Sequence, residues 1–209
     1  MIISIHQPSF FAYSGVLEKI AESDVHVVLA NAQFERGNYH NRFRLGDGHE
    51  LWPTYRWLTM SINQHLEPLI DKKYNRPRED WTTIKRKIPE YEDVLAHFDD
   101  CIRSGPYLVD VNFAILLKVL ELLEVETRVI FDYPTTLRGT ERLVDICRRT
   151  GASTYLSGPS GPKYLDMKQF KAAGIAVEIQ AQVPPRAAVE VLRERAFSPV
   201  AKKGAARVG

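Results

Sequence analysis

Residues suited to binding an anion follow a short apolar segment late in the chain. Thr154-Tyr155-Leu156 is expected to form a buried strand, and it leads directly into a Ser/Gly/Pro segment that ends at Lys163. Small residues let backbone N–H groups approach an anion, and the lysine adds a positive charge. A plain Pro/Gly turn with a surface lysine is the alternative interpretation. The residues predicted to bind the phosphate or activated donor are Ser157, Gly158, Ser160, Gly161 and Lys163.

A histidine and a glutamine follow the first apolar segment of the chain. Residues 1–5 are expected to form a strand that stops at Pro8, because proline cannot extend a sheet ladder. His6 and Gln7 would then lie at the carboxyl end of a strand, where α/β folds bind their ligands. Imidazole titrates near neutral pH. We therefore predict that His6 is a general base and that Gln7 contacts the substrate; a hydrogen-bonded structural histidine is the alternative.

A long polar segment at residues 31–44 lacks apolar periodicity and is rich in amide, arginine and histidine side chains. Such a segment in a compact domain is more often functional than a simple connection. Gln33, Asn41 and Arg42 have fixed hydrogen-bonding shapes, so we predict that they bind a polar substrate. The alternative is a solvated β-hairpin with its turn at Asp47-Gly48 and its return strand at 51–60.

Strands and helices are expected to alternate around these residues. Val25–Leu29 is a β-branched run typical of a strand covered on both faces, so residues 1–29 predict a β-α-β unit. The intervening helix has Val16, Leu17 and Ile20 on its apolar face and Glu18, Lys19 and Glu22 on its exposed face. Further helices are predicted at 81–87, 91–102, 111–123 and 167–173, and further strands at 126–131 and 175–179. Another helix is expected to begin after an N-cap at Thr140 and to end at Gly151.

This pattern predicts an α/β fold, with a Rossmann-like, mostly parallel sheet flanked by helices and an inserted β-hairpin and helical segment. We expect one α/β domain at residues 1–180, of which 62–125 are a partly helical insertion. Residues 181–209 differ in composition and are expected to form a weakly packed tail, with roughly the last ten residues disordered.

The composition is that of a globular protein with a formal net charge of +2. Acidic and basic residues nearly cancel, so bulk charge predicts no nucleic-acid partner. No apolar run is long enough for a membrane span, and the start of the chain has no signal-peptide pattern. Cys101 and Cys147 are interpreted as reduced thiols, which favours a cytoplasmic location. Their spacing indicates no metal site.

Several motifs in this order resemble the WbqC-like family, over roughly residues 2–180. The residues that carry the resemblance are Ile5-His6-Gln7-Pro8, Gly15, Lys19-Ile20, Ser23-Asp24, Gln33-Phe34, Asn41-Arg42, the run from Gly139 to Cys147, Thr154 to Pro159, and Tyr164-Leu165-Asp166.

The resemblance implies transfer of glycine or another small acyl group to an amine, such as that of an amino sugar, in polysaccharide or natural-product biosynthesis. In this hypothesis His6 deprotonates the amine, and Asn41 and Arg42 hold the sugar or the oxyanion. Glu141 and Arg142 are assigned to substrate binding through the loop that they orient, with an exposed helix pair as the alternative. No metal or flavin motif is present; the cofactor expected, if any, is a nucleotide such as ATP or a nucleotide-sugar.

Two departures from the family pattern affect this hypothesis. Relatives usually have an acidic pair where this chain has Ala30 and Asn31, and nothing after Gln180 resembles their C-terminal segment. Activity is therefore expected to be altered or lost if the acidic pair is needed. The alternatives are a non-catalytic protein that binds a nucleotide-sugar or a partner enzyme, and an enzyme of adenylate or nucleotidyl transfer. The expected partners are a small-molecule substrate and a second copy of the chain or a partner enzyme.

Overall fold

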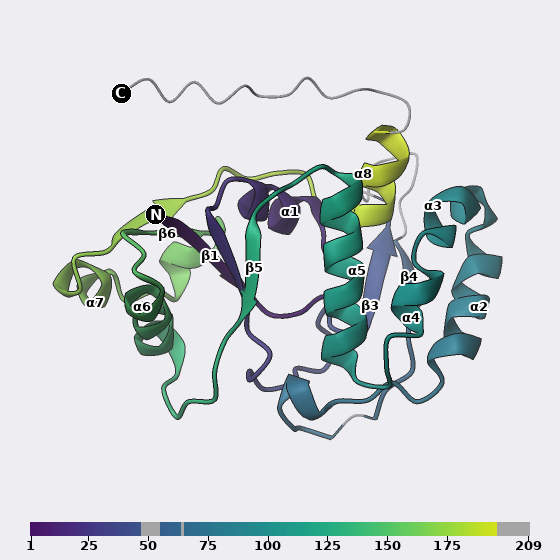
Figure 1. Cartoon of the computed structure of the whole chain (residues 1–209), viewed down its shortest axis with the longest axis horizontal. Helices are drawn as coiled ribbons and strands as arrows, with labels where there is room; N and C mark the ends of the chain where they lie inside the picture. The colour runs from purple at the N-terminus through teal and green to yellow at the C-terminus, as the bar shows by residue number, and fades with distance from the viewer. Residues whose placement is uncertain (47–54, 64, 196–209) are drawn as a thin grey trace.

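The computed structural model describes residues 1–46, 55–63 and 65–195. Within these residues, five parallel strands form the central sheet, in the order β5-β2-β1-β6-β7 (Figure 1). The strands are β1 (Ile2–His6), β2 (Val25–Val28), β5 (Arg128–Phe131), β6 (Thr154–Ser157) and β7 (Ala176–Ile179). The predicted α/β class with a parallel sheet is confirmed.

The strand order creates a topological switch point between β1 and β6. From β1 the chain moves outward to β2 and β5, and it then returns past β1 to form β6 and β7. Ser4 pairs with Leu156, and the ladder between the two strands ends at this pair although both strands continue. Ligands in open α/β sheets bind in the crevice beyond such a point, at the carboxyl ends of the strands.

Alternate residues of β1 face two different layers. Ile3 and Ile5 pack with α6 (Gly139–Thr150) and α7 (Met167–Ala172) in one apolar cluster. Ser4 and His6 face the opposite layer, because side chains alternate along a strand. That layer contains α1 (Ser14–Ala21) and α5 (Leu108–Leu122), and Figure 1 shows α5 between the sheet and the hairpin.

The chain between β2 and β5 forms the predicted hairpin and helices. Strands β3 (Arg42–Leu45) and β4 (Arg56–Thr59) are antiparallel, and α2 (Pro77–Lys87), α3 (Glu92–Ala96) and α4 (Asp99–Ile102) follow. Phe11 joins these elements in the larger core. Its ring centroid lies 5.1 Å from that of Phe43, 5.9 Å from Trp81 and 4.8 Å from Phe98. The predicted turn at Asp47-Gly48 lies outside the described residues.

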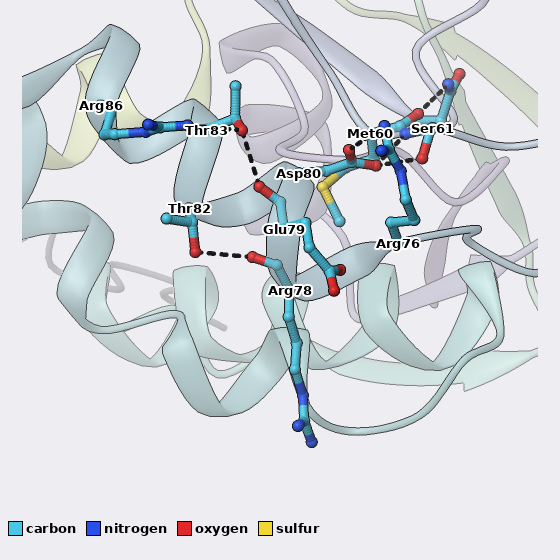
Figure 2. Close-up of polar contacts among 10 residues, drawn as sticks. Met60, Ser61, Arg76, Arg78, Glu79, Asp80, Thr82, Thr83 and Arg86 are labelled. Atoms are coloured by element: carbon cyan, nitrogen blue, oxygen red, sulfur yellow. Dashed lines mark hydrogen bonds and ion pairs between the residues drawn. The ribbon is translucent and has the colours of Figure 1, made fainter.

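A carboxylate in the first turn of α2 fastens this helix to the chain after β4 (Figure 2). Asp80 accepts hydrogen bonds from the backbone N–H of Ser61, at 2.6 Å, and from the Ser61 hydroxyl. One turn on, the Thr83 hydroxyl donates to the Glu79 carbonyl at 2.9 Å. Asp80 therefore fixes the start of α2 against the chain after β4, whereas the Thr83 hydrogen bond lies within the helix.

Two helix predictions differ from the structure in detail. The helix predicted at 91–102 is divided into α3 and α4, because the backbone at His97 and Phe98 leaves the α-helical hydrogen-bonding pattern. Thr140 is not the N-cap of α6, which begins at Gly139 after Arg138. The Thr140 hydroxyl instead accepts a hydrogen bond from the backbone N–H of Asp166 at 3.0 Å, so it ties α6 to the start of α7. Gly151 ends α6 with a φ of 72°, as predicted.

The tail predicted to pack weakly is partly buried. Residues 188–195 form α8 (Ala188–Arg195), and Ala188 and Val189 are fully buried in the larger core. The preceding segment runs along the start of α1, where Ser14 N–H donates to the Arg186 carbonyl at 2.7 Å. The expectation of weak packing is therefore wrong for α8. The residues predicted to be disordered at the chain end lie outside the described part. None of the described helices has both the length and the apolar character needed to cross a bilayer.

Candidate functional site

His6 lies at the carboxyl end of β1, beside the switch point. Its Nδ1 is 2.8 Å from the carbonyl oxygen of Gln7. Because a carbonyl only accepts hydrogen bonds, Nδ1 carries the proton and Nε2 has the free lone pair. Burial, with a further contribution from the nearby Lys19 charge, lowers the pKa of His6 from 6.5 to about 3. The imidazole is therefore unprotonated at neutral pH, with Nε2 as an acceptor.

Lys19 is buried, although the sequence analysis placed it on the exposed face of its helix. Its side chain is on α1 and only 5% of the residue is exposed. Lys19 Nζ donates to the Ile5 carbonyl at 3.1 Å, and no carboxylate of the described residues lies within ion-pair distance of it. Burial lowers the pKa of Lys19 from 10.5 to about 8. A buried cation without an anionic partner is a common feature of functional sites.

The backbone geometry places the Lys19 ammonium between β1 and β6. The Met1 carbonyl accepts from Thr154 N–H in β6, whereas the Ile2 and His6 carbonyls accept from residues next to β2. Successive carbonyls along a strand point to opposite sides, so the Ile5 carbonyl points toward β6. The ladder to β6 has already ended at Ser4, and the lysine occupies this carbonyl instead. Lys19 therefore marks the place where the two strands separate.

The predicted anion segment begins on the neighbouring strand at the same edge of the sheet. Since Ser4 pairs with Leu156, Ser157 is in register with Ile5, and Gly158 with His6. Ser157 therefore faces the α6 and α7 layer, whereas His6 faces α1. The two segments share an edge, but these two side chains point to opposite faces. A Cβ built at Gly158 would meet no atom within 4 Å, so there is open space beside the Gly158 backbone.

Gln180, directly after β7, extends this row of residues. Ser157 pairs with Ile179, and Gln180 N–H donates to the Ser157 carbonyl at 2.8 Å. Gln180 is thus in register with Gly158 and faces the same layer as His6. Only 7% of the residue is exposed, yet its side-chain Nε2 has no hydrogen-bond partner among the described residues. Within the paired part of the sheet, two spacings of about 4.8 Å separate β1 from β7.

Tyrosine side chains flank this row. The ring centroid of Tyr13, at the start of α1, lies 6.5 Å from that of His6. Tyr164 is close enough to contribute to the raised pKa of Tyr13, whose main cause is burial. Tyr13 also continues an aromatic row, with centroid distances of 6.0 Å to Tyr39 and 5.6 Å from Tyr39 to Trp57. We use the name switch-point site for His6, Lys19, Gly158 and Gln180, between Tyr13 and Tyr164.

Two small pockets border the switch-point site. The first lies between the sheet, α1 and α5, and Gln7, His26 and Asn112 are its main polar lining residues. The second lies beside the hairpin, where Tyr13, Tyr39 and Arg44 meet the Pro185–Ala187 backbone. No residue from Ser157 to Lys163 lines either pocket. The pockets adjoin the site on the His6 side.

The predicted hairpin residues have well-defined contacts. Asn41 is buried and its Nδ2 donates to the Met60 carbonyl at 2.7 Å. The Arg42 guanidinium stacks on Trp57, 4.0 Å from the ring centroid, and donates to the Gly37 carbonyl. Gln33 is exposed and its backbone pairs with Pro68. Arg42 therefore belongs to the aromatic row, whereas Asn41 fastens the hairpin.

A buried ion pair occupies the other end of the same sheet edge. Asp132 follows β5, and its fully buried carboxylate pairs with Arg142 of α6. Asn31 donates to the same carboxylate from its backbone N–H, at 3.2 Å, and from its side chain, at 3.1 Å. The carboxylate that follows β5 thus lies next to Asn31. Glu141, by contrast, is exposed at the start of α6.

The remaining residues of the anion segment form a short turn. Gly161–Lys163 is a 3-10 turn, with Ser160 and Lys163 exposed. A Cβ at Gly161 would lie 2.1 Å from Ser157 Oγ, so only glycine fits against that buried hydroxyl. Packing therefore requires a glycine at position 161. The sequence analysis had instead assigned Gly161 to ligand contact.

Sequence reasoning missed Lys19 and Gln180. Lys19 was part of a quoted motif, and it lies three residues after Val16, on the border of the apolar face of α1. Gln180 is a polar residue at the end of the last strand, which is the place where a ligand contact is expected. Among the described residues, no group of three His, Cys, Asp or Glu side chains is arranged to hold a metal ion. Burial raises the pKa of Cys147 to about 12, so its thiol is a poor nucleophile.

Comparisons with known proteins give a match to a family model and to a similar protein. A family model described as the WbqC-like protein family matches residues 7–187, which extends past Gln180, where the resemblance was expected to end. An uncharacterized protein of Mycobacterium tuberculosis, Rv1507c, is 25% identical over 194 residues, which cover 84% of this chain and 80% of that protein. No solved structure gives a significant match.

Proposed function

Because the chain belongs to the WbqC-like protein family, we propose that it is a transferase that moves glycine or another small acyl group from an activated donor onto an amine. The acceptor class is an amino sugar or a nucleotide-sugar that carries an amine. The observation that carries this proposal is the His6 imidazole, held unprotonated at the carboxyl end of β1 beside the switch point, with its Nδ1 on the Gln7 carbonyl.

In this reaction the amine nitrogen attacks the acyl carbonyl carbon, and a C–N bond forms while the carbonyl π pair moves to oxygen. The oxyanion then collapses and the bond to the leaving group breaks, with the electron pair departing on that group. The amine proton moves to His6 Nε2. Since the pKa of His6 is about 3, the imidazole accepts this proton only after C–N bond formation has made the nitrogen acidic.

The neighbouring groups have complementary roles. The backbone next to Gly158 stabilises the negative charge that develops on the acyl oxygen. Gln7, which lines the first pocket, orients the acceptor. The exposed turn at Ser160 and Lys163 meets the leaving group of the donor.

A transfer assay tests this proposal. The purified chain is mixed with chemically activated glycine and a panel of amino-sugar nucleotides, and products are followed by mass spectrometry. His6→Ala should lower kcat by about 10²–10⁴-fold and leave acceptor binding nearly unchanged. His97→Ala, an exposed histidine on the hairpin side of the molecule, is the matched control. Full turnover by His6→Ala would show that His6 is not the base.

A second candidate, non-catalytic binding of a nucleotide-sugar, is favoured by the aromatic row. Tyr13, Tyr39 and Trp57 offer faces for a base or sugar ring, and the Arg42 guanidinium lies beside them to meet a phosphate. Binding of nucleotide-sugars that weakens in Trp57→Ala, with no product from any donor, would support this candidate in place of the transferase.

A further inference from the structure

Two hydrogen-bond donors at the switch-point site lack the partner that their burial calls for. The Lys19 ammonium has only the Ile5 carbonyl among its hydrogen-bond partners and no carboxylate of the described residues in ion-pair range. Gln180 Nε2 is buried and has no hydrogen-bond partner in the described part of the chain. Burying such groups without compensation costs free energy, so they are normally satisfied by a ligand when protein groups do not satisfy them.

The two donors lie on the same face of the sheet. Lys19 reaches the β1–β6 gap from α1, and Gln180 extends from β7 on the face that α1 covers. Gly158 lies between them in register, and the space beside its backbone is open. A side chain at position 158 would occupy this open space.

We propose that Lys19 and Gln180 form a binding site for the carboxylate of a small ligand at the switch point. The ammonium carries the charge, and the amide fixes the second oxygen. This inference rests on the proposed function for the location of the ligand, and it assigns to the ligand a free carboxylate that is separate from the acyl group that is transferred. Binding itself requires no transfer.

The nearby titratable groups favour an anion. His6 of β1 and His26 of β2 are the ionisable groups that interact with Lys19, and burial lowers the pKa of both imidazoles. Neither histidine is charged at neutral pH, so neither competes for the anion nor neutralises it. Burial raises the pKa of Tyr13, so this phenol is also uncharged there.

The experiment is an NMR titration of the full chain with acetate, with acetamide as the uncharged analogue and inorganic phosphate as the alternative anion. Acetate should shift the Gln180 side-chain NH₂ and Gly158 amide signals, and acetamide should not. Lys19→Met and Gln180→Met should each raise the acetate Kd at least tenfold. Lys168→Met, an exposed lysine on α7, should leave it unchanged.

The pH dependence separates charge recognition from a purely structural role. Acetate binding should weaken between pH 7 and pH 9.5, as Lys19 loses its proton, and Lys19→Met should lack this dependence. Lys19→Met should also fold, because the substitution replaces a buried unpaired charge by an apolar side chain. Its thermal unfolding gives the check on folding.

Each other outcome is decisive. Equal acetate binding by Lys19→Met and the native chain, or shifts confined to residues outside the switch-point site, would overturn the proposal. Tight phosphate binding with no effect of acetate would also overturn it in favour of a phosphate site. Acetate binding at this site by a protein that transfers no glycine would refute the transferase proposal and leave the carboxylate site intact.

Discussion

At the scale of single residues, one ammonium and two uncharged imidazoles lie near the carboxyl end of β1. Lys19 contacts the Ile5 carbonyl, and the Ser4 hydroxyl bonds to His26 Nδ1 at 2.8 Å. Both histidines have lowered pKa values because they are buried near the ammonium. This electrostatic arrangement has a measurable consequence for stability.

We expect the protein to lose stability in mild acid through His6. Its pKa is about 3 in the folded chain and 6.5 in the unfolded chain, so the unfolded state binds more protons between these values. The free energy of unfolding is therefore not reduced by His6 above pH 6.5. It decreases as the pH falls from 6.5 toward 3, because the imidazole binds a proton in the unfolded state and not in the folded state. Between pH 7 and pH 5 the free energy of unfolding should fall by roughly 1–2 kcal/mol from this group.

Urea denaturation at the two pH values measures the effect. His6→Gln should reduce the loss, whereas His97→Gln should not, because that side chain is exposed. The same acid loss in His6→Gln and the native chain would mean that the imidazole is accessible to protons in the folded state.

At the scale of elements, the ion pair between Arg142 of α6 and Asp132 indicates a structural role for Arg142 in place of substrate binding. The sequence predicted substrate binding, and the structure places the guanidinium on the fully buried carboxylate of Asp132. Arg142→Met would leave that carboxylate buried with only Asn31 as a partner. We expect a loss of about 3–5 kcal/mol in the free energy of unfolding.

The matched control is Arg149→Met, which removes an exposed ion pair with Asp145 on the same helix and should cost less than about 1 kcal/mol. Adding Asp132→Asn to Arg142→Met should recover much of the lost stability. An Arg142→Met protein that keeps full stability and loses substrate binding would instead support the role predicted from sequence. Chemical denaturation together with nucleotide-sugar binding distinguishes the two.

The parallel strands and most helices were predictable because their patterns depend on nearby residues. The β-branched run at Val25–Val28 requires burial on both faces, and Gly151 supplies the positive φ that ends α6. Lys19 shows the limit of this reasoning. Polarity alone assigned it to solvent, and its burial depends on a gap between β1 and β6 that no local pattern reveals.

At the scale of the whole molecule, the site combines segments separated by most of the chain. The sequence predicts each of the two strands separately, and parallel strands end at the same edge of a sheet. The structure adds that β1 and β6 are neighbours, so the segments that begin at His6 and Gly158 follow adjacent strands. The place of Gln180 at a strand end is visible in the sequence, but its position relative to Gly158 depends on the register of β7 and β6. Its missing hydrogen bond appears only when all three strands are in place.

The C-terminal segment is part of this assembly, which leads to a prediction about truncation. A chain that ends at Val183 would lose the buried contacts of Ala188, Val189 and Leu192. Burial of each large apolar side chain stabilises by about 1.5–3 kcal/mol, so the loss should exceed about 3 kcal/mol. We expect a clearly lower Tm, or no cooperative transition, in calorimetry.

A chain that ends at Arg195 keeps every contact that the structure describes and should have the native Tm. Equal Tm values for both shortened chains would show that residues 184–195 add no stability and that the domain predicted at 1–180 is self-sufficient.

The backbone bond from Ser14 to Arg186 has a wider consequence for how this fold attracts negative groups. Dinucleotide-binding α/β folds contact their ligand with main-chain amides at the start of the first helix. The dipoles of these amides do not change with pH. Here the Ser14 amide already donates to the Arg186 carbonyl, and the positive charge near it that attracts an anion belongs to Lys19. Alkaline surroundings can therefore abolish it without any movement of the backbone.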